Sequence, residues 1–210
     1  MKQEKLFDNE FMSKSIDVSN NLLPNDGVVI YYGQILSNEK ANQLLSILLE
    51  KIEWRQDEIL MFGKKIITKR KVAWYGDEGL KYTYSKTTKT AIPWSQELLE
   101  LKSIVEETTG ENYNSCLLNL YHNGSEGMGF HSDDEKELKK DGAIASVSIG
   151  AERKFVFKHK TTKDKVSLYL EAGSLLLMEG TTQTYWQHQL TVSKKIVSPR
   201  INLTFRMIEK

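Results

Sequence analysis

Residues 200–207 read Arg200-Ile201-Asn202-Leu203-Thr204-Phe205-Arg206-Met207, a strict alternation of polar and apolar side chains. A period of two places alternate residues on opposite faces of a β-strand, so this segment predicts a strand with one polar face. A solvated edge strand would explain the alternation. It would not explain why two arginines bracket Asn202 and Thr204, and we therefore interpret the polar face as one wall of an internal cavity.

Short β-rich segments precede this strand, and no helical segment is expected among them. Turns containing Gly, Asp, Lys-Asp or Ser-Pro separate them. The segments cover residues 115–121, 143–149, 153–159, 165–170 and 174–178. Consecutive short strands favour an antiparallel sandwich or barrel over a parallel α/β sheet. Within the first segment Asn119 and Tyr121 share one face, which gives the cavity a second polar wall.

Two amphipathic helices are predicted ahead of the strands. Apolar residues recur at helical spacing in 38–53, after the candidate N-cap Ser37, and again in 95–109, which Gly110 ends. The sequence therefore predicts an α+β, mainly β protein, in which N-terminal helices support a jelly-roll core. We assign residues 1–25 to a flexible segment, 26–210 to a single domain and 111–210 to the jelly-roll core.

Composition limits the possible function classes. The chain has 210 residues, 40% of them hydrophobic and 27% charged, which suits one globular domain with a real core. No run approaches the roughly 18 apolar residues that span a bilayer, and the polar N-terminus does not resemble a secretory signal. The single cysteine, Cys116, excludes an internal disulfide and fits a reducing compartment. We expect a cytoplasmic monomer, nuclear if the source is eukaryotic, with no membrane partner.

Basic residues are clustered although the net charge is only +1. Residues 64–71 carry five positive charges and no negative one, and residues 153–165 carry six against the single Asp164. Either run alone is typical of a solvated surface. Together, on one small domain, they indicate a polyanionic partner.

A candidate metal site combines His131 and Asp133 with the distant His188. Two residues apart on an extended segment, the first two side chains point the same way and can reach one cation. Three protein ligands on one face leave the remaining positions open, as an iron(II) oxygenase needs. A zinc hydrolase can use similar ligands, but it would not explain the two arginines.

The other two histidines fit the site less well. His159 lies between Lys158 and Lys160, and we expect it to be solvated or to face phosphate. His122 follows Tyr121 and is expected to point away from the cavity. His188 is therefore the preferred third ligand.

The arginines suggest what the open metal positions hold. A dicarboxylic keto acid needs a metal at one end and a guanidinium at the other, because the guanidinium fork matches a carboxylate. We predict that Arg200 binds the distal carboxylate and that Arg206 lies nearer the metal. Neutral side chains complete the predicted cosubstrate site: Asn119, Tyr121, Asn202 and Thr204.

These motifs resemble those of the AlkB family of nucleic-acid demethylating dioxygenases. The resemblance rests on Asn119-Leu-Tyr121, on His131-Ser-Asp133-Asp-Glu135, on His188 and on the segment 200–206. Further pieces, at 75–77, 82–84, 144–150, 155–157 and 173–178, match its eukaryotic-type DNA repair branch. The likeness runs from about residue 26 to the C-terminus.

The resemblance implies a double-stranded β-helix core, a nucleotide-recognition lid over residues 60–92, and Fe(II), 2-oxoglutarate and O₂ as reactants. It also implies oxidative removal of the methyl group from bases such as 1-methyladenine or 3-methylcytosine, with release of formaldehyde. A base must leave the stack to reach the iron. DNA is the preferred partner over RNA.

The lid segment fits that task. Met61, Phe62 and Gly63 form an apolar tip before the basic run 64–71, and such a tip can fill the gap that a flipped base leaves. Phe62 resembles the central aromatic of the family's hydrophobic finger; the alternative is a buried hairpin residue. Further substrate contacts are predicted at Tyr82, Thr83, Tyr84 and Asp134. The tyrosines could instead serve packing, and Asp134 could orient basic lid residues.

Two other functions remain open at this point. The same chemistry could act on methylated RNA or on a protein side chain. A catalytically silent nucleic-acid-binding module is a third possibility, but binding alone would need neither a metal site nor a cosubstrate site.

Overall fold

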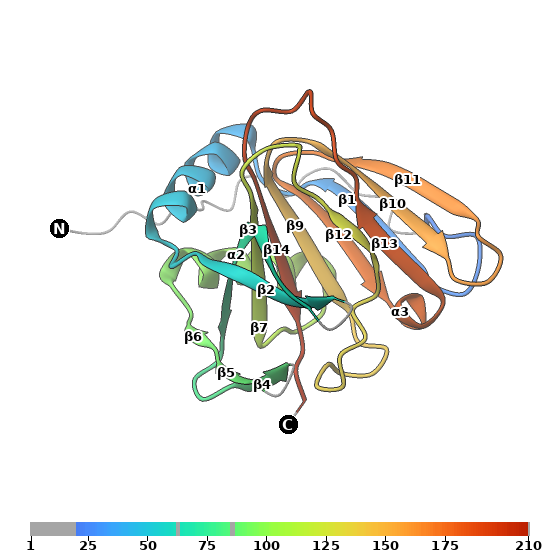
Figure 1. Cartoon of the computed structure of the whole chain (residues 1–210), viewed down its shortest axis with the longest axis horizontal. Helices are drawn as coiled ribbons and strands as arrows, with labels where there is room; N and C mark the ends of the chain where they lie inside the picture. The colour runs from blue at the N-terminus through green and yellow to red at the C-terminus, as the bar shows by residue number, and fades with distance from the viewer. Residues whose placement is uncertain (1–19, 62–63, 85–86, 210) are drawn as a thin grey trace.

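The computed structural model describes residues 20–61, 64–84 and 87–209. Strands dominate it (Figure 1). The helices are α1 (Asn38–Lys51), α2 (Gln96–Thr109) and α3 (Thr182–Tyr185). The strands are β1 (Val28–Gln34), β2 (Arg55–Met61), β3 (Lys64–Gly76), β4 (Lys81–Tyr84), β5 (Thr87–Thr90), β6 (Ile92–Pro93), β7 (Ser115–Tyr121), β8 (Met128–His131), β9 (Ile144–Gly150), β10 (Arg153–His159), β11 (Lys165–Leu170), β12 (Ser174–Glu179), β13 (Trp186–Leu190) and β14 (Arg200–Arg206).

Two sheets form the jelly roll that the sequence predicts. The major sheet has the order β1-β12-β9-β14-β7-β3-β2, with β6 beside β3, and the minor sheet has the order β11-β10-β13-β8. Every pairing is antiparallel except that of β3 with β6. The mainly β, jelly-roll prediction is confirmed.

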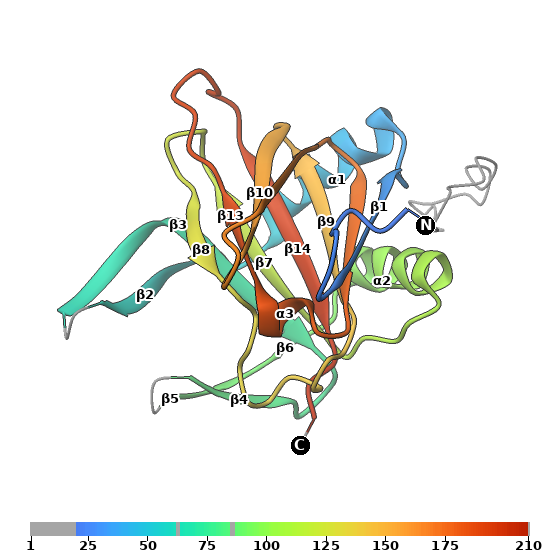
Figure 2. The same ribbon diagram turned by 90° about the vertical axis from the view of Figure 1, so that its right-hand side faces the viewer.

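The molecule has three layers, with the major sheet in the middle. Apolar residues of α1 and α2, such as Leu44 and Leu101, pack with Leu203 and its neighbours on one face of this sheet. A second core cluster, which includes Phe157 and Trp186, lies between the two sheets. Figure 2 shows α1 and α2 on one side of β14 and the minor sheet on the other. The polar face of β14 is therefore turned toward the minor sheet.

Both predicted long helices are present, with their expected caps. The Ser37 side chain accepts from the Lys40 amide at 3.2 Å, and the Ser95 side chain accepts from the Leu98 amide at 3.4 Å. Gly110 ends α2 in the left-handed conformation, with φ of 74°. Such caps satisfy amides and carbonyls that have no partner inside the helix.

The expectation that no helix interrupts the strands was wrong. The short helix α3 joins β12 to β13, and one turn is too short to give a periodic apolar pattern. Strand β1, ahead of α1, also escaped prediction, and it forms an edge of the major sheet by pairing with β12.

The segment 60–92 contains the hairpins β2–β3 and β4–β5, which extend away from the jelly roll (Figure 2), whereas residues 71–76 of β3 pair with β7 in the major sheet. Its role as a lid stays a prediction. Among the described residues, no helix is long and apolar enough to cross a bilayer.

Gly150 gives a stability prediction at the end of β9. It pairs with Arg200, has φ of +87°, and a Cβ there would lie 2.5 Å from the Pro199 carbonyl oxygen. Gly150→Ala should lower the free energy of unfolding by about 2–4 kcal/mol, because it adds a backbone clash to the cost of a left-handed residue. Urea denaturation would measure the loss.

Gly79→Ala is the matched control, since Gly79 has φ of +75° but no atom within 4 Å of an added Cβ. Gly79→Ala should lower the free energy of unfolding by only the cost of a non-glycine residue in the left-handed conformation, about 1–2 kcal/mol. Equal losses in the two variants would contradict the predicted clash.

Candidate metal centre

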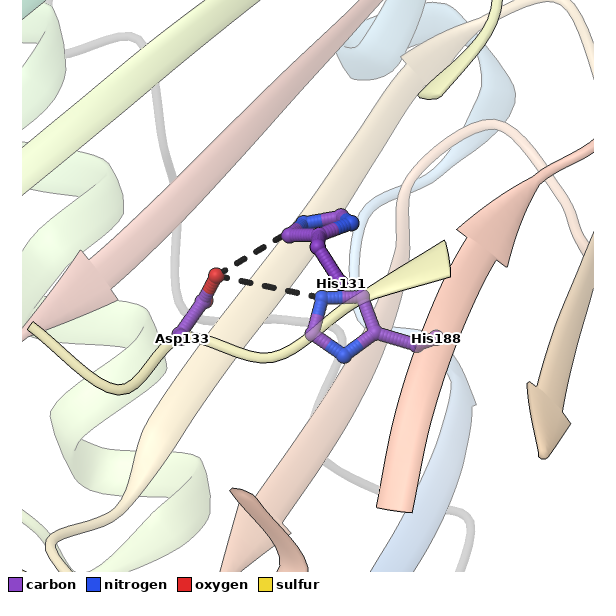
Figure 3. Close-up of side chains that lie close together, drawn as sticks. All are labelled: His131, Asp133 and His188. Carbon is purple, nitrogen blue, oxygen red and sulfur yellow. Dashed lines mark ion pairs between the residues drawn. The ribbon is translucent and has the colours of Figure 1, made fainter. Parts of the chain in front are cut away.

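Three side chains from β8, β13 and the segment after β8 converge inside the jelly roll. His131, the last residue of β8, pairs directly with His188 on β13. Nε2 of His131 lies 3.7 Å from Oδ1 of Asp133, and Nε2 of His188 lies 3.8 Å from the same oxygen. Figure 3 shows both imidazoles turned toward the carboxylate. The candidate ligand atoms lie within 4.8 Å of one another, so one cation could contact all of them.

A main-chain contact orients His131. Its Nδ1 lies 2.9 Å from the Gly129 carbonyl oxygen, so Nδ1 carries the proton and donates it. The Nε2 lone pair is then free to bind a metal. His188 is held differently, by packing against the rings of Phe155 and Phe157 at centroid distances of 5.5 and 6.2 Å.

The electrostatics of the cluster favour the metal-binding protonation states. Burial alone would raise the pKa of Asp133. The charge of Arg206, whose Nη2 donates to Oδ2 at 2.6 Å, acts together with the two histidines to outweigh burial and lower the pKa to about 2. Burial lowers the pKa of His188 to about 4. At neutral pH the site therefore offers a carboxylate and a neutral imidazole, a donor set that suits iron(II).

Arg200 is a buried cation with an unusual set of partners. It is 2% exposed, and Nη2 donates to Ser148 Oγ at 2.9 Å and to Asn202 Oδ1 at 2.7 Å. No carboxylate of the described residues pairs with it, and its buried Nε has no acceptor there. Burial lowers its pKa to about 10, which still leaves it charged at neutral pH. Such a charge is costly unless an anion binds beside it.

The six residues predicted for a cosubstrate lie on two neighbouring strands. Arg200 pairs with Tyr121, and Asn202 pairs with Asn119. The guanidinium carbon of Arg200 lies 5.7 Å from the Tyr121 ring centroid. Asn202 donates to Thr204 Oγ1 at 2.8 Å. This polar row leads from Arg200 to Arg206 and so to the candidate metal ligand Asp133.

The sequence missed Arg153, which was assigned to a basic surface run. It is 1% exposed, and its guanidinium donates to main-chain carbonyls on two loops, among them Glu126 at 2.6 Å and Thr191 at 2.7 Å. Its carbon also lies 5.9 Å from the Tyr121 ring centroid. Arg153 therefore ties the loops that follow β7 and β13 together, and it lies against the same tyrosine ring as Arg200.

The expectation that His159 is solvated or faces phosphate was wrong. It is 3% exposed, lies 4.9 Å from the Trp186 ring centroid, and its Nε2 lies 3.3 Å from Asp26 Oδ2. Period two puts His159 on the same face of β10 as Phe155 and Phe157, which explains its burial. His122 is exposed and contacts Glu126, outside the cluster, as expected.

Two cavities flank the histidine and aspartate cluster. Asp133, Arg206 and the exposed Asp134 line one of about 550 Å³, whose rim includes Lys136, Lys139, Lys140 and Lys160. His131 lines the other, of about 450 Å³, together with Lys69 and Arg70 from the basic run 64–71. Both cavities combine access to the cluster with basic side chains.

The remaining predicted substrate residues cannot be placed in these cavities. Phe62 and Gly63 lie outside the described residues. Met61 ends β2, and Tyr82, Thr83 and Tyr84 belong to β4, but their side chains also lie outside what the structure describes. Their roles stay predictions.

Comparison with known proteins places the chain among oxygenases. Residues 28–206 match the family described as the 2OG-Fe(II) oxygenase superfamily. The chain is 39% identical to the human protein named DNA oxidative demethylase ALKBH2, over 87% of this chain and 74% of the relative. The mouse protein of that name is also 39% identical, with 87% and 81% covered.

A second group of relatives is nearly as similar. Human alpha-ketoglutarate-dependent dioxygenase alkB homolog 3 is 37% identical over 86% of this chain and 66% of the relative. The solved structure of OsALKBH1 superposes with a TM-score of 0.58 at 15% identity, covering 88% of this chain and 98% of the other. That likeness supports the fold alone.

Proposed function

The chain belongs to the 2OG-Fe(II) oxygenase superfamily and, within it, to the AlkB family, and from this premise we propose that it is a DNA repair dioxygenase. Its proposed substrates are N-methylated bases of the 1-methyladenine and 3-methylcytosine type. The reaction consumes 2-oxoglutarate and O₂ and yields the restored base, formaldehyde, succinate and CO₂. One oxygen atom enters succinate, and the other leaves in formaldehyde.

One observation carries the proposal: inside the jelly roll, the polar row of β14 links a metal-ligand set to a buried guanidinium, that of Arg200, which has no carboxylate partner among the described residues. An iron(II) ion held by His131, Asp133 and His188 would supply oxidation of the methyl C–H bond with 2-oxoglutarate and O₂. Arg200 would hold the distal carboxylate of the keto acid, and this match of charge explains a buried cation with no carboxylate partner among the described residues.

The neighbouring side chains would fix the position of the keto acid. Tyr121 and Asn119 face Arg200 and Asn202 across the strand pair and offer neutral hydrogen-bonding groups. Arg206 holds the Asp133 carboxylate by a 2.6 Å ion pair, which keeps it charged and restricts its rotation. Thr204 and Asn202 keep the polar row hydrogen-bonded between the two arginines.

The flipped base would enter beside Asp134, in the cavity that Asp133 also lines. A carboxylate suits these bases because methylation gives them a positive charge. We assign Met61, Phe62, Gly63, Tyr82, Thr83 and Tyr84 to base flipping and stacking, which must offset an unstacking cost of a few kcal/mol. The expected monomeric state and the cytoplasmic or nuclear location also remain proposals.

A comparison of substrates tests the assignment to DNA. Turnover would be measured on one sequence carrying 1-methyladenine as single-stranded DNA, as duplex DNA and as RNA. We expect DNA to be repaired faster than RNA. Faster repair of RNA would overturn the DNA assignment, and equal rates on duplex and single strands would count against the finger role of Phe62.

A non-catalytic binding module is less consistent with the structure. Nucleic-acid binding alone requires neither a buried ligand cluster nor a buried guanidinium without a carboxylate partner in the described part of the chain. If the wild-type protein makes no succinate with any nucleic acid, this alternative would replace the enzyme.

A further inference from the structure

The three candidate ligands lie where a β-ladder comes to its end. His131 and His188 are a direct cross-strand pair between β8 and β13. Strand β8 ends at His131, so the ladder does not extend to Asp133, two residues further on. Another group must therefore hold the main chain that carries the third ligand.

Two side-chain hydrogen bonds continue the connection beyond the ladder. Ser132 Oγ donates to the Trp186 carbonyl oxygen at 2.9 Å. The Asp133 amide donates to Gln183 Oε1, also at 2.9 Å. The segment 131–133 is thus fastened, residue by residue, to the segment 183–188, which ends in His188.

Gln183 itself is held in place. It lies on α3, whose residue Thr182 accepts from the Val28 amide at 2.9 Å and donates to the Glu179 carbonyl at 2.6 Å. The Gln183 carbonyl accepts from Lys160 Nζ at 2.8 Å, and its side-chain Nε2 donates to Met178 Sδ at 3.4 Å. Hydrogen bonds therefore hold both the main chain and the side chain of Gln183 without a bound metal.

We propose that Gln183 is a positioning residue, which holds Asp133 in the orientation that metal binding requires. The side-chain amide oxygen of Gln183 accepts from the Asp133 amide and so fixes this peptide. Oδ1 of Asp133 then lies 3.7 Å from Nε2 of His131 and 3.8 Å from Nε2 of His188. Without an acceptor the peptide could rotate, and the carboxylate would lose its place between the histidines. Substitution of residues that hydrogen-bond to metal ligands commonly lowers the metal affinity by about 10–100-fold. The inference rests on the proposed function only in that the cluster binds a metal.

Mn(II) affinity of the apoprotein, measured by electron paramagnetic resonance of the free ion, tests this role without relying on turnover. Gln183→Met preserves length but cannot accept the hydrogen bond, and we expect it to weaken Mn(II) binding about 10-fold or more. Gln183→Glu keeps an acceptor oxygen and is expected to bind Mn(II) at least as tightly as wild type. Gln189→Met, on the outward face of β13, is the matched control and should match wild type.

The outcomes separate the possibilities. Wild-type Mn(II) affinity in Gln183→Met would overturn the inference. A loss of Mn(II) affinity of about 10-fold or more in Gln183→Glu would also overturn it, and this variant can be tested even if Gln183→Met does not fold. A purely structural role would lower the melting temperature of both the apoprotein and the loaded protein, with affinity unchanged. If wild type itself binds no Mn(II), the metal site fails and the proposed function fails with it.

Discussion

Replacing His131 with alanine is expected to lower demethylation and succinate formation at least about a thousand-fold, because a catalytic metal supplies several kcal/mol of transition-state stabilisation. Loss of one of the three protein ligands would weaken the binding of the metal ion to the protein. His131 is the ligand best suited to this test, since its side chain is 30% exposed while those of Asp133 and His188 are 6% exposed. Its removal should disturb the folded core least.

The measurement is turnover at saturating Fe(II), together with DNA affinity. His122→Ala provides the control, because His122 is an exposed histidine that contacts Glu126 away from the cluster. We expect it to retain wild-type turnover. The account would be contradicted if His131→Ala kept more than about a tenth of wild-type turnover, which corresponds to a loss under 1.4 kcal/mol. DNA affinity should change little, since the predicted lid and basic residues are intact.

Arg200→Met should weaken 2-oxoglutarate binding about 30-fold or more, because truncating one partner of a buried charge pair costs about 2–5 kcal/mol. The free energy of unfolding of the protein without 2-oxoglutarate should change little. In the apoprotein this charge is buried without a carboxylate partner among the described residues, so its removal also removes an unfavourable term. Arg200→Lys keeps the charge but loses the fork, and an intermediate affinity is expected.

Anaerobic thermal denaturation with Mn(II) would measure this effect as the stabilisation that 2-oxoglutarate adds. Arg55→Met, at an exposed arginine, is the control and should show the full ligand-induced shift. A full shift in Arg200→Met would show that the distal carboxylate is bound elsewhere. Loss of the shift in both variants would indicate a failure unrelated to Arg200.

Local patterns predicted the elements that depend on local physics. The helices α1 and α2 follow from apolar spacing and from caps at Ser37, Ser95 and Gly110. The polar face of β14 follows from strict alternation, and the structure turns it toward the minor sheet, where Arg206 meets Asp133. These are the places where a short window contains the determining information.

Other features depend on contacts between distant segments. Strands β8 and β13 are short, and β8 contains a glycine, so neither gave a readable pattern although they carry both candidate histidine ligands. Gln183 gained its contact with Asp133 only because α3 folds back beside the end of β8. No local pattern could have identified that contact.

The basic run 153–165 shows how charge counting can mislead. Arg153 and His159 were grouped with surface residues, yet both are buried. Alternation along β10 would have placed them with Phe155 and Phe157 on the inner face, leaving Lys154 and Lys158 outside. A charged residue in a strand should therefore be assigned to a face before it is assigned to a surface.

The most direct test is the stoichiometry of the wild-type reaction on single-stranded DNA carrying 1-methyladenine, with Fe(II), 2-oxoglutarate, ascorbate and O₂. Mass spectrometry would quantify restored adenine, formaldehyde and succinate. The account predicts equal amounts of the three products and none when 2-oxoglutarate is omitted. Intact methylated DNA from protein with confirmed iron occupancy, or demethylation without 2-oxoglutarate, would contradict it.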